Sequence, residues 1–156
     1  MTHPHALMVV GSLNVDLTFR LLVGAEWGET VPARFTQAFG GKGANLASAA
    51  RRFGARTIFV GAIGDDVYGS EAVVELEQYG VSHRLQVVPA TPTGTAGIIV
   101  REDGENLIAL DPGANLHLDR NHVRKALEEA SEEHGSILVA TNFETAHEAI
   151  EEVMSH

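Results

Sequence analysis

The sequence contains no cysteine, so it forms no disulfide bond and offers no thiolate for catalysis or metal binding. It has no secretory hydrophobic segment near its start and no apolar run long enough to cross a membrane. Basic residues are also few: 11 lysines and arginines against 21 aspartates and glutamates give a net charge of −10, which argues against nucleic-acid binding. We therefore expect a cytoplasmic protein that binds neither nucleic acid nor membranes.

The 156 residues are 44% hydrophobic, which is enough for one folded domain with a core. Charge is distributed unevenly, because residues 1–64 carry six basic and three acidic side chains while residues 65–156 carry five basic and eighteen acidic ones. Most of these acids fall on predicted helices, where a solvent-exposed face accounts for them. The eight histidines are scattered and never form a His-Glu-x-x-His motif, so we expect no metal site.

Short apolar runs alternate along the chain with segments of helical periodicity. This alternation predicts an α/β fold of three layers, with a parallel sheet between helices. Glycines follow two of the helical segments, at Gly54 and Gly80, and act as C-terminal caps. The predicted strands are residues 6–10, 57–61, 84–88 and 136–140, and the predicted helices are residues 42–53, 67–79, 120–133 and 145 to the end.

Two β-rich insertions, at about residues 15–39 and 95–110, interrupt this alternation. Each is predicted to contain two strands, and the second has Asp103-Gly104 between its strands, a strong hairpin signal. Neither insertion is followed at once by a strand of the main sheet. We expect the two insertions to pair with each other and to form a small sheet that acts as a lid over the strand ends.

The strongest local signal is the glycine-rich segment Gly40-Gly41-Lys42-Gly43-Ala44-Asn45, which opens a predicted helix. A helix start of this kind directs unpaired N–H groups and the positive end of the helix dipole toward oxygen-rich ligands. Lys42 adds a cation, and Asn45 adds a donor and an acceptor. The segment is not a Walker P-loop, because Thr36 and Gly43 stand where that motif needs glycine and Ser/Thr. An ordinary turn that begins a helix is the alternative.

A second polar cluster lies where the first predicted strand ends, at residues 11–16. Ligands of open α/β sheets bind beyond the carboxyl ends of the strands. Asn14 and Asp16 are two residues apart, so in an extended segment their side chains project to the same side. A binding site and a simple polar turn both agree with this pair, since Asn and Asp are common turn residues.

In order and spacing, these segments together resemble the ribokinase-like (PfkB) carbohydrate kinases over nearly the whole chain. The lysine of Gly-Gly-Lys-Gly-Ala-Asn is similar to that of the ribokinases within the family, which favours a pentose and ribose above all. The matching segments are Gly11-Ser12-Leu13-Asn14-Val15-Asp16, Gly28-Glu29-Thr30, Gly40 to Ala47, Gly54-Ala55, Val60 to Asp66, Gly69, Thr93-Gly94-Thr95-Ala96 and Pro112-Gly113-Ala114-Asn115.

The resemblance implies ATP-dependent transfer of a phosphoryl group to a sugar hydroxyl, with ATP and Mg²⁺ bound in the full-length family member. It also implies a homodimer in which the small sheets of two subunits clasp each other. By matching position, it implies six residues that contact the sugar: Asn14, Asp16, Gly41, Lys42, Asn45 and Glu144.

Two motifs of the family have no match in this sequence. One is Gly-Ala-Gly-Asp, which carries the catalytic base; the other is Asn-x-x-Glu, linked to Mg²⁺, from which Asn142-Phe143-Glu144 differs by one missing residue. We therefore assign no catalytic residue. We expect residues 1–156 to be the N-terminal portion of a ribokinase-like domain that is catalytically inactive by itself. The alternative is a non-catalytic module of the same fold that binds a sugar or dimerises.

Overall fold

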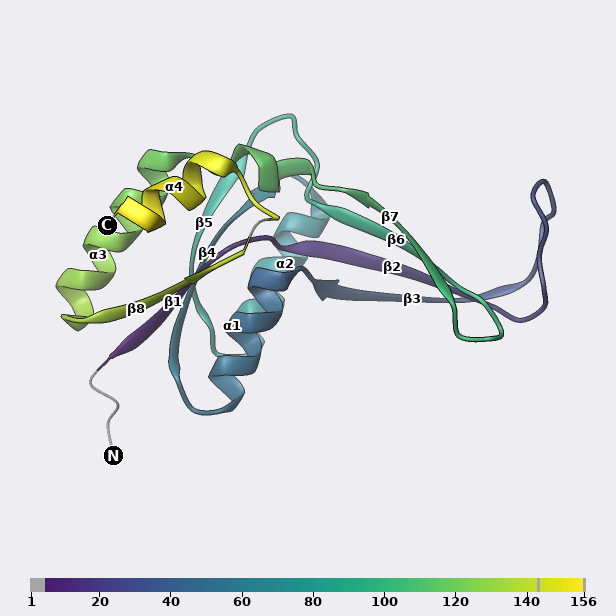
Figure 1. Cartoon of the computed structure of the whole chain (residues 1–156), viewed down its shortest axis with the longest axis horizontal. Helices are drawn as coiled ribbons and strands as arrows, with labels where there is room; N and C mark the ends of the chain where they lie inside the picture. Colours follow the sequence, from purple (N-terminus) through teal and green to yellow (C-terminus); the bar gives the residue numbers. More distant parts are fainter. Residues whose placement is uncertain (1–4, 143, 156) are drawn as a thin grey trace.

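The structure, a computed structural model, describes residues 5–142 and 144–155. Its body is built on a sheet of four parallel strands in the order β5-β4-β1-β8 (Figure 1). The two central strands, β1 and β4, are buried along nearly their whole length, as their continuous apolar sequences predict. The strands are β1 (Ala6–Val10), β4 (Arg56–Gly64), β5 (Ser82–Val88) and β8 (Ile137–Thr141).

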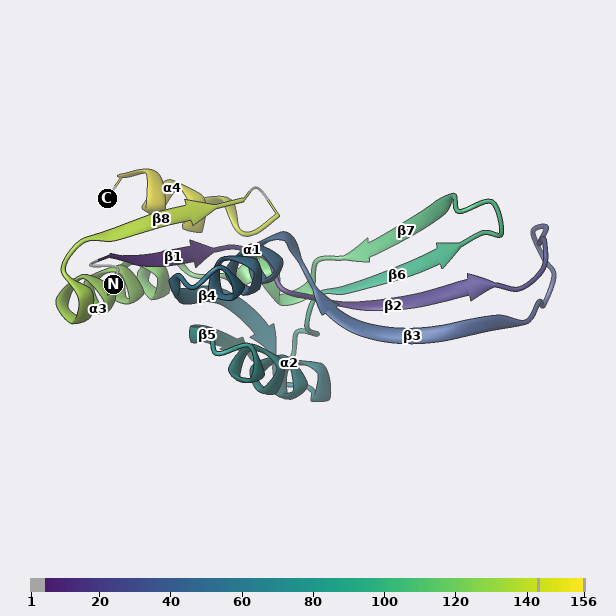
Figure 2. The same ribbon diagram turned by 90° about the horizontal axis from the view of Figure 1, so that it is seen from below.

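Helices cover both faces of this sheet, which confirms the predicted three layers (Figure 2). Alternate residues of β1 supply the two cores: Met8 and Val10 pack with α3 and α4, whereas Val9 packs with α1 and α2. Complete burial of a side chain of this size stabilises the fold by about 1.5–3 kcal/mol. The helices are α1 (Lys42–Arg52), α2 (Val67–Gln78), α3 (Arg120–His134) and α4 (His147–Ser155).

The structure differs from the sequence prediction at several element ends. Strand β4 continues to Gly64 rather than residue 61, because Ile63 and Gly64 stay in register with Val87 and Val88 of β5. The segment after β7 (Asn106–Asp111), expected as a turn, forms a short 3-10 helix, η1 (Gly113–His117). The last helix was expected to begin at residue 145 and begins at His147; the final residue of that prediction, 156, lies outside the described residues.

The two β insertions pair with each other and form a second sheet of four strands in the order β3-β2-β6-β7. Each insertion is an antiparallel pair, and parallel pairing between β2 and β6 joins the two. This accessory sheet projects away from the body (Figure 1), and its role as a lid stays a prediction. Its strands are β2 (Asn14–Leu21), β3 (Ala33–Gly40), β6 (Thr95–Val100) and β7 (Asn106–Asp111).

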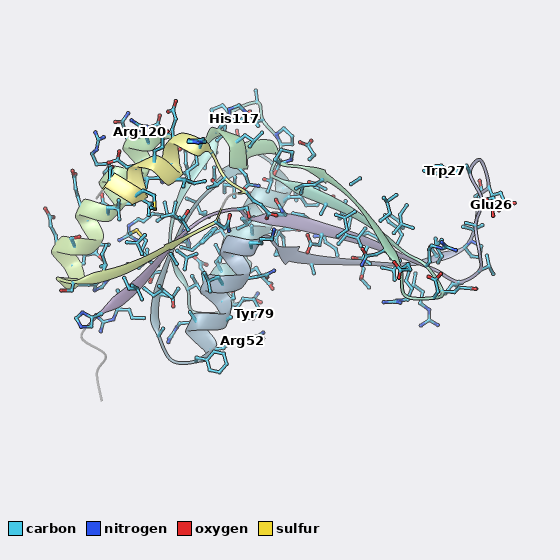
Figure 3. The ribbon with its side chains drawn as sticks, in the orientation of Figure 1. Glu26, Trp27, Arg52, Tyr79, His117 and Arg120 are labelled. Atoms are coloured by element: carbon cyan, nitrogen blue, oxygen red, sulfur yellow. The ribbon has the colours of Figure 1, made fainter. Side chains whose placement is uncertain are left out.

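Trp27 lies at the far end of the accessory sheet, in the loop between β2 and β3 (Figure 3). It is 95% exposed, so it is not packed among the described residues. In the described part of the chain, none of the helices combines the length and apolar character that a membrane crossing needs.

One carboxylate joins the accessory sheet to the body. Asp66 caps α2 by accepting from Gly69 N at 2.8 Å, and it also accepts from Thr93 N at 2.8 Å and Thr93 Oγ1 at 2.7 Å. Thr93 lies just before β6, and its hydroxyl accepts from Gly64 N at 3.0 Å. Burial opposes ionisation of Asp66, but these hydrogen bonds outweigh it and lower the pKa of the carboxyl below 3.8.

We expect Asp66→Ala to reduce the free energy of unfolding at pH 7 by about 1–3 kcal/mol, because it removes a helix cap and leaves the buried Thr93 groups unpaired. The folded pKa of Asp66 lies below its unfolded value of 3.8. Its stabilisation is therefore present above about pH 4 and is lost as the pH falls through the folded pKa. Urea unfolding at a series of pH values measures both effects.

Asp65→Ala is the matched control, since Asp65 is the neighbouring acid and its side chain is exposed. The prediction is contradicted if both variants lose the same stability, or if the effect of Asp66→Ala does not shrink in acid.

Candidate functional site

The candidate site lies where the carboxyl ends of β1 and β8 meet the start of α1 and the base of the accessory sheet. The turn from β1 to β2 and the first turn of α1 touch, with Ala44 N donating to Ser12 O at 3.1 Å. Gly43 makes this approach possible, because a Cβ atom there would lie 2.8 Å from the backbone of Gly11. Any larger residue would push the helix away from the strand end.

Gly41 immediately precedes α1 and has a φ of +89°, a conformation that favours glycine. A Cβ atom at this position would lie 2.7–2.9 Å from the backbone atoms of Ser12, Leu13 and Asn14. No side chain caps the helix at this end. The N-terminus of α1 therefore lies close against the backbone of the β1–β2 turn, with its dipole directed at the site.

Asn14 and Asp16 occupy the same face of β2, opposite Gly40 and Ala38 of β3. Asn14 is 6% exposed, and its Oδ1 accepts from Asn115 Nδ2 at 2.9 Å. Asp16 is half-buried, and a Cβ atom on Gly40 would collide with its carboxylate. Burial raises the pKa of Asp16, and the described residues donate no hydrogen bond to that carboxylate.

Glu144 follows β8 and reaches the same place from the other end of the chain. Its carboxylate accepts from Lys42 Nζ at 2.5 Å and from Ser12 Oγ at 3.3 Å. The Glu144 backbone N–H donates to Asn142 Oδ1 at 3.1 Å. The Lys42 side chain is 70% exposed, so this ion pair adds little stability, and a ligand can displace either partner at low cost.

Asn45 contacts one of the other predicted residues through its backbone, with its N–H donating to Gly41 O at 2.9 Å. It lies in the first turn of α1, is exposed, and lines a cavity of about 500 Å³ between α1 and α2 together with Leu13 and Phe39. Arg52 and Tyr79 line the same cavity, with the guanidinium 4.9 Å from the centre of the tyrosine ring (Figure 3). In residues 5–142 and 144–155, no hydrogen bond joins the Asn45 side chain to the other predicted site residues.

Sequence reasoning gave no role to two polar residues at the site, Ser12 and Asn115. Both stood in the segments that carry the resemblance, but a lone serine in a turn and an asparagine after Pro-Gly-Ala show no chemistry by themselves. The structure places Ser12 against Glu144 and Asn115 against Asn14, across 132 and 101 residues of sequence. Only the folded chain brings these pairs together.

The site offers two carboxylates, one carboxamide and one ammonium group within a small region, a set that suits a ligand rich in hydroxyl groups. A divalent cation needs several oxygen ligands close together. Among the described residues, no group of three or more His, Asp or Glu side chains could hold a metal ion.

Residues 4–155 match the family model described as pfkB family carbohydrate kinase. Among curated proteins, the ribokinase of Schizosaccharomyces pombe is 38% identical over 131 residues, which are 79% of this chain and 41% of that relative. The chain thus spans less than half the length of this relative.

Solved structures agree with this match. The ribokinase of Giardia lamblia superposes with a TM-score of 0.86 at 30% identity, covering 97% of this chain and 50% of that one. A ribokinase of Arabidopsis thaliana, solved with ribose and ATP, gives a TM-score of 0.64 at 27% identity and covers 86% of this chain and 53% of that one. The resemblance noted from the sequence is confirmed, and the chain belongs to the pfkB family of carbohydrate kinases.

Proposed function

We propose that this chain forms the sugar-binding part of an ATP-dependent sugar kinase, with ribose as the first candidate substrate. Family membership and the Arabidopsis thaliana ribokinase solved with ribose and ATP support the reaction class. The observation that carries the site is the half-buried carboxylate of Asp16, which accepts no hydrogen bond from the described residues. Burial without a partner is unfavourable, and two sugar hydroxyls would relieve it through charge-assisted hydrogen bonds.

Each neighbouring group has a role in this proposal. Asn14 supplies a donor beside the Asp16 acceptor. Gly41 allows the backbone of α1 to come close to the β1–β2 turn. Lys42 and Glu144 exchange their ion pair for hydrogen bonds to hydroxyl groups of the sugar. Asn45 is proposed as a further contact from the first turn of α1, although its side chain lies toward the α1–α2 cavity.

The accessory sheet would serve as the lid of this site. Register places Ala96, Ile98 and Leu110 on the same face as Asp16, so a sugar held there has an apolar surface beside it. Closure of that surface would exclude water and orient the acceptor hydroxyl. Positioning of this kind is a large part of phosphoryl-transfer catalysis, and ATP supplies the phosphoryl group when it is bound in the whole protein.

We expect Asp16→Asn to weaken ribose binding at least about tenfold, because it removes a charged acceptor of hydrogen bonds. The same change should raise the stability of the ligand-free chain at pH 7. The folded pKa of Asp16 lies above its unfolded value, so the ionised carboxylate destabilises the fold as the pH rises through the folded pKa, and asparagine avoids that loss. Titration calorimetry and thermal unfolding measure the two effects.

The control is Asp103→Asn, at the hairpin between β6 and β7, where the amide oxygen can still accept from Glu105 N. Its ribose affinity should equal that of the unchanged chain. Equal affinity in the Asp16 variant, or no ribose binding by the unchanged chain at millimolar concentration, would contradict the proposal.

The absence of kinase activity in the 156 residues alone stays a prediction. We expect no ribose-dependent hydrolysis or transfer from ATP above background in a coupled assay, since the catalytic-base motif of the family has no match. A turnover of about 1 s⁻¹ or more would overturn this prediction. The cytoplasmic location expected from the sequence also stays a prediction.

Exposed apolar side chains on the accessory sheet support the homodimer that the resemblance implies. A row of apolar side chains crosses one face, where the Phe19 and Phe35 rings lie 5.2 Å apart beside Ile99 and Leu107. Their exposed fractions are 42–56%. Ile108, on the opposite face, is 55% exposed. We propose that a second copy of the chain covers this sheet, because contiguous exposed apolar surface usually marks an interface.

Analytical ultracentrifugation should show a dimer at micromolar concentration. Phe35→Asp and Ile108→Asp each place a charge on one face of the sheet, and we expect one of them to give a folded monomer. Glu132→Lys, on the exposed surface of α3, is the control and should remain dimeric. A monomeric unchanged chain, or a dimer that survives both aspartate substitutions, would refute the proposal.

A further inference from the structure

The side chain of Asn115 is the most densely hydrogen-bonded polar group beside the candidate site. It lies in η1 and is 1% exposed. Its Oδ1 accepts from Leu13 N at 2.9 Å. Its Nδ2 donates to Leu13 O at 3.0 Å, to Asn14 Oδ1 at 2.9 Å and to Pro112 O at 2.9 Å. All polar atoms of the buried amide are therefore used.

These partners permit only one orientation of the Asn115 amide. Leu13 N is a donor and must face the oxygen, while the carbonyls of Leu13 and Pro112 are acceptors and must face the nitrogen. In the flipped orientation, the Asn115 NH₂ group would face the N–H of Leu13, and the Asn115 oxygen would face the carbonyl oxygens of Leu13 and Pro112. Since leaving several buried polar groups unpaired is costly, the orientation is strongly fixed.

The orientation of Asn115 in turn fixes Asn14. Because Asn115 presents N–H, Asn14 must present its carbonyl oxygen to it, and the Asn14 NH₂ group must point the other way. That NH₂ group donates no hydrogen bond to the described residues. It lies on the face of β2 that also carries Asp16, so a free donor stands beside a free acceptor.

The backbone of Asn115 also holds the segment that follows Glu144. Its carbonyl oxygen accepts from Thr145 Oγ1 at 3.1 Å and from Ala146 N at 3.0 Å, directly after Glu144. One buried residue thus joins the β1–β2 turn, the end of the accessory sheet and the segment that carries Glu144.

Gly94 leaves the space in which the two amides meet. A Cβ atom on Gly94 would overlap Asn115 Nδ2 and Asn14 Oδ1. The carbonyl oxygen of Gly94 accepts from Val15 N at 2.8 Å. Alanine at this position would separate the amides without removing either one, which makes it an independent perturbation.

We infer that Asn115 is a positioning residue of the sugar site: it locks the Asn14 carboxamide so that its NH₂ group faces the ligand as a hydrogen-bond donor. This inference deepens the proposed function and rests on it. Asn115 is buried behind Asn14 and acts on the sugar through that residue alone.

The orientation is tested first without a ligand. In ¹H–¹⁵N spectra of the full chain, the Asn115 side-chain NH₂ protons should exchange with water at least about tenfold more slowly than those of Asn106, which is exposed on β7. In Asn14→Ala the Asn115 NH₂ resonances should move, because one acceptor is lost. Exchange as fast as that of Asn106, or unmoved resonances, would overturn the inference.

Ribose binding then tests the role by a double-mutant cycle. Asn14→Ala and Asn115→Ala should each weaken ribose binding about tenfold or more, and the double variant should be no weaker than Asn14→Ala by more than about twofold. Gly94→Ala should give the same loss as Asn115→Ala. If Asn115 only supports the fold, the single losses will multiply in the double variant, and that result would overturn the inference.

Gln86→Ala is the control, since Gln86 holds the other end of η1 through His117 O and also accepts from Asp119 N. It should lower the melting midpoint and leave ribose affinity unchanged. Should Asn115→Ala fail to fold, Gly94→Ala and the exchange measurement decide the inference. If the unchanged chain binds no ribose, the proposed function fails and the positioning role fails with it, while the exchange measurement still reports whether the amides are locked.

Discussion

The contact on which the site depends is the close approach of the N-terminus of α1 to the turn that follows β1. Glycines at positions 41 and 43 permit it, because their missing Cβ atoms leave room for the backbone of residues 11–14. This approach brings a helix dipole, Lys42 and the start of β2 to one strand end.

A second constraint comes from two hydrogen-bonded anchors, Asp66 and Asn115, between the body and the accessory sheet. Asp66 ties the root of β6 to the start of α2 through Thr93, and Asn115 ties the end of β7 to the β1–β2 turn. Both anchors are polar groups with all their partners in the protein, so they hold the strands in one arrangement. Asp16 differs from them, because its carboxylate is half-buried and the described residues donate no hydrogen bond to it. The two anchors thus have their hydrogen-bond partners within the protein, whereas the Asp16 carboxylate of the site accepts no hydrogen bond from the described residues.

Much of the fold follows from local sequence. Continuous apolar runs predicted β1 and β8, and glycines predicted the ends of α1 and α2. Asp103-Gly104 predicted the β6–β7 hairpin. Pairing between the two insertions was also predicted. The C-terminal end of β4 and the helix η1 were not predicted. The end of β4 depends on register with β5, and η1 depends on packing against the core of the main sheet. Asn14 and Asp16 were predicted to project to one side, and register confirms it.

By itself, the sequence determined the family, the layer order and the residue types available to the site, because these depend on periodicity, on glycine positions and on short motifs that are local along the chain. Tertiary structure decided which of these residues meet. It brought Glu144 into hydrogen-bond distance of Lys42, and Asn115 into hydrogen-bond distance of Asn14, although each pair is about a hundred residues apart in sequence. It also placed Asn45 in the lining of the α1–α2 cavity. The physical reason is that a hydrogen bond between distant residues depends on how helices and strands pack, and no local pattern encodes that geometry.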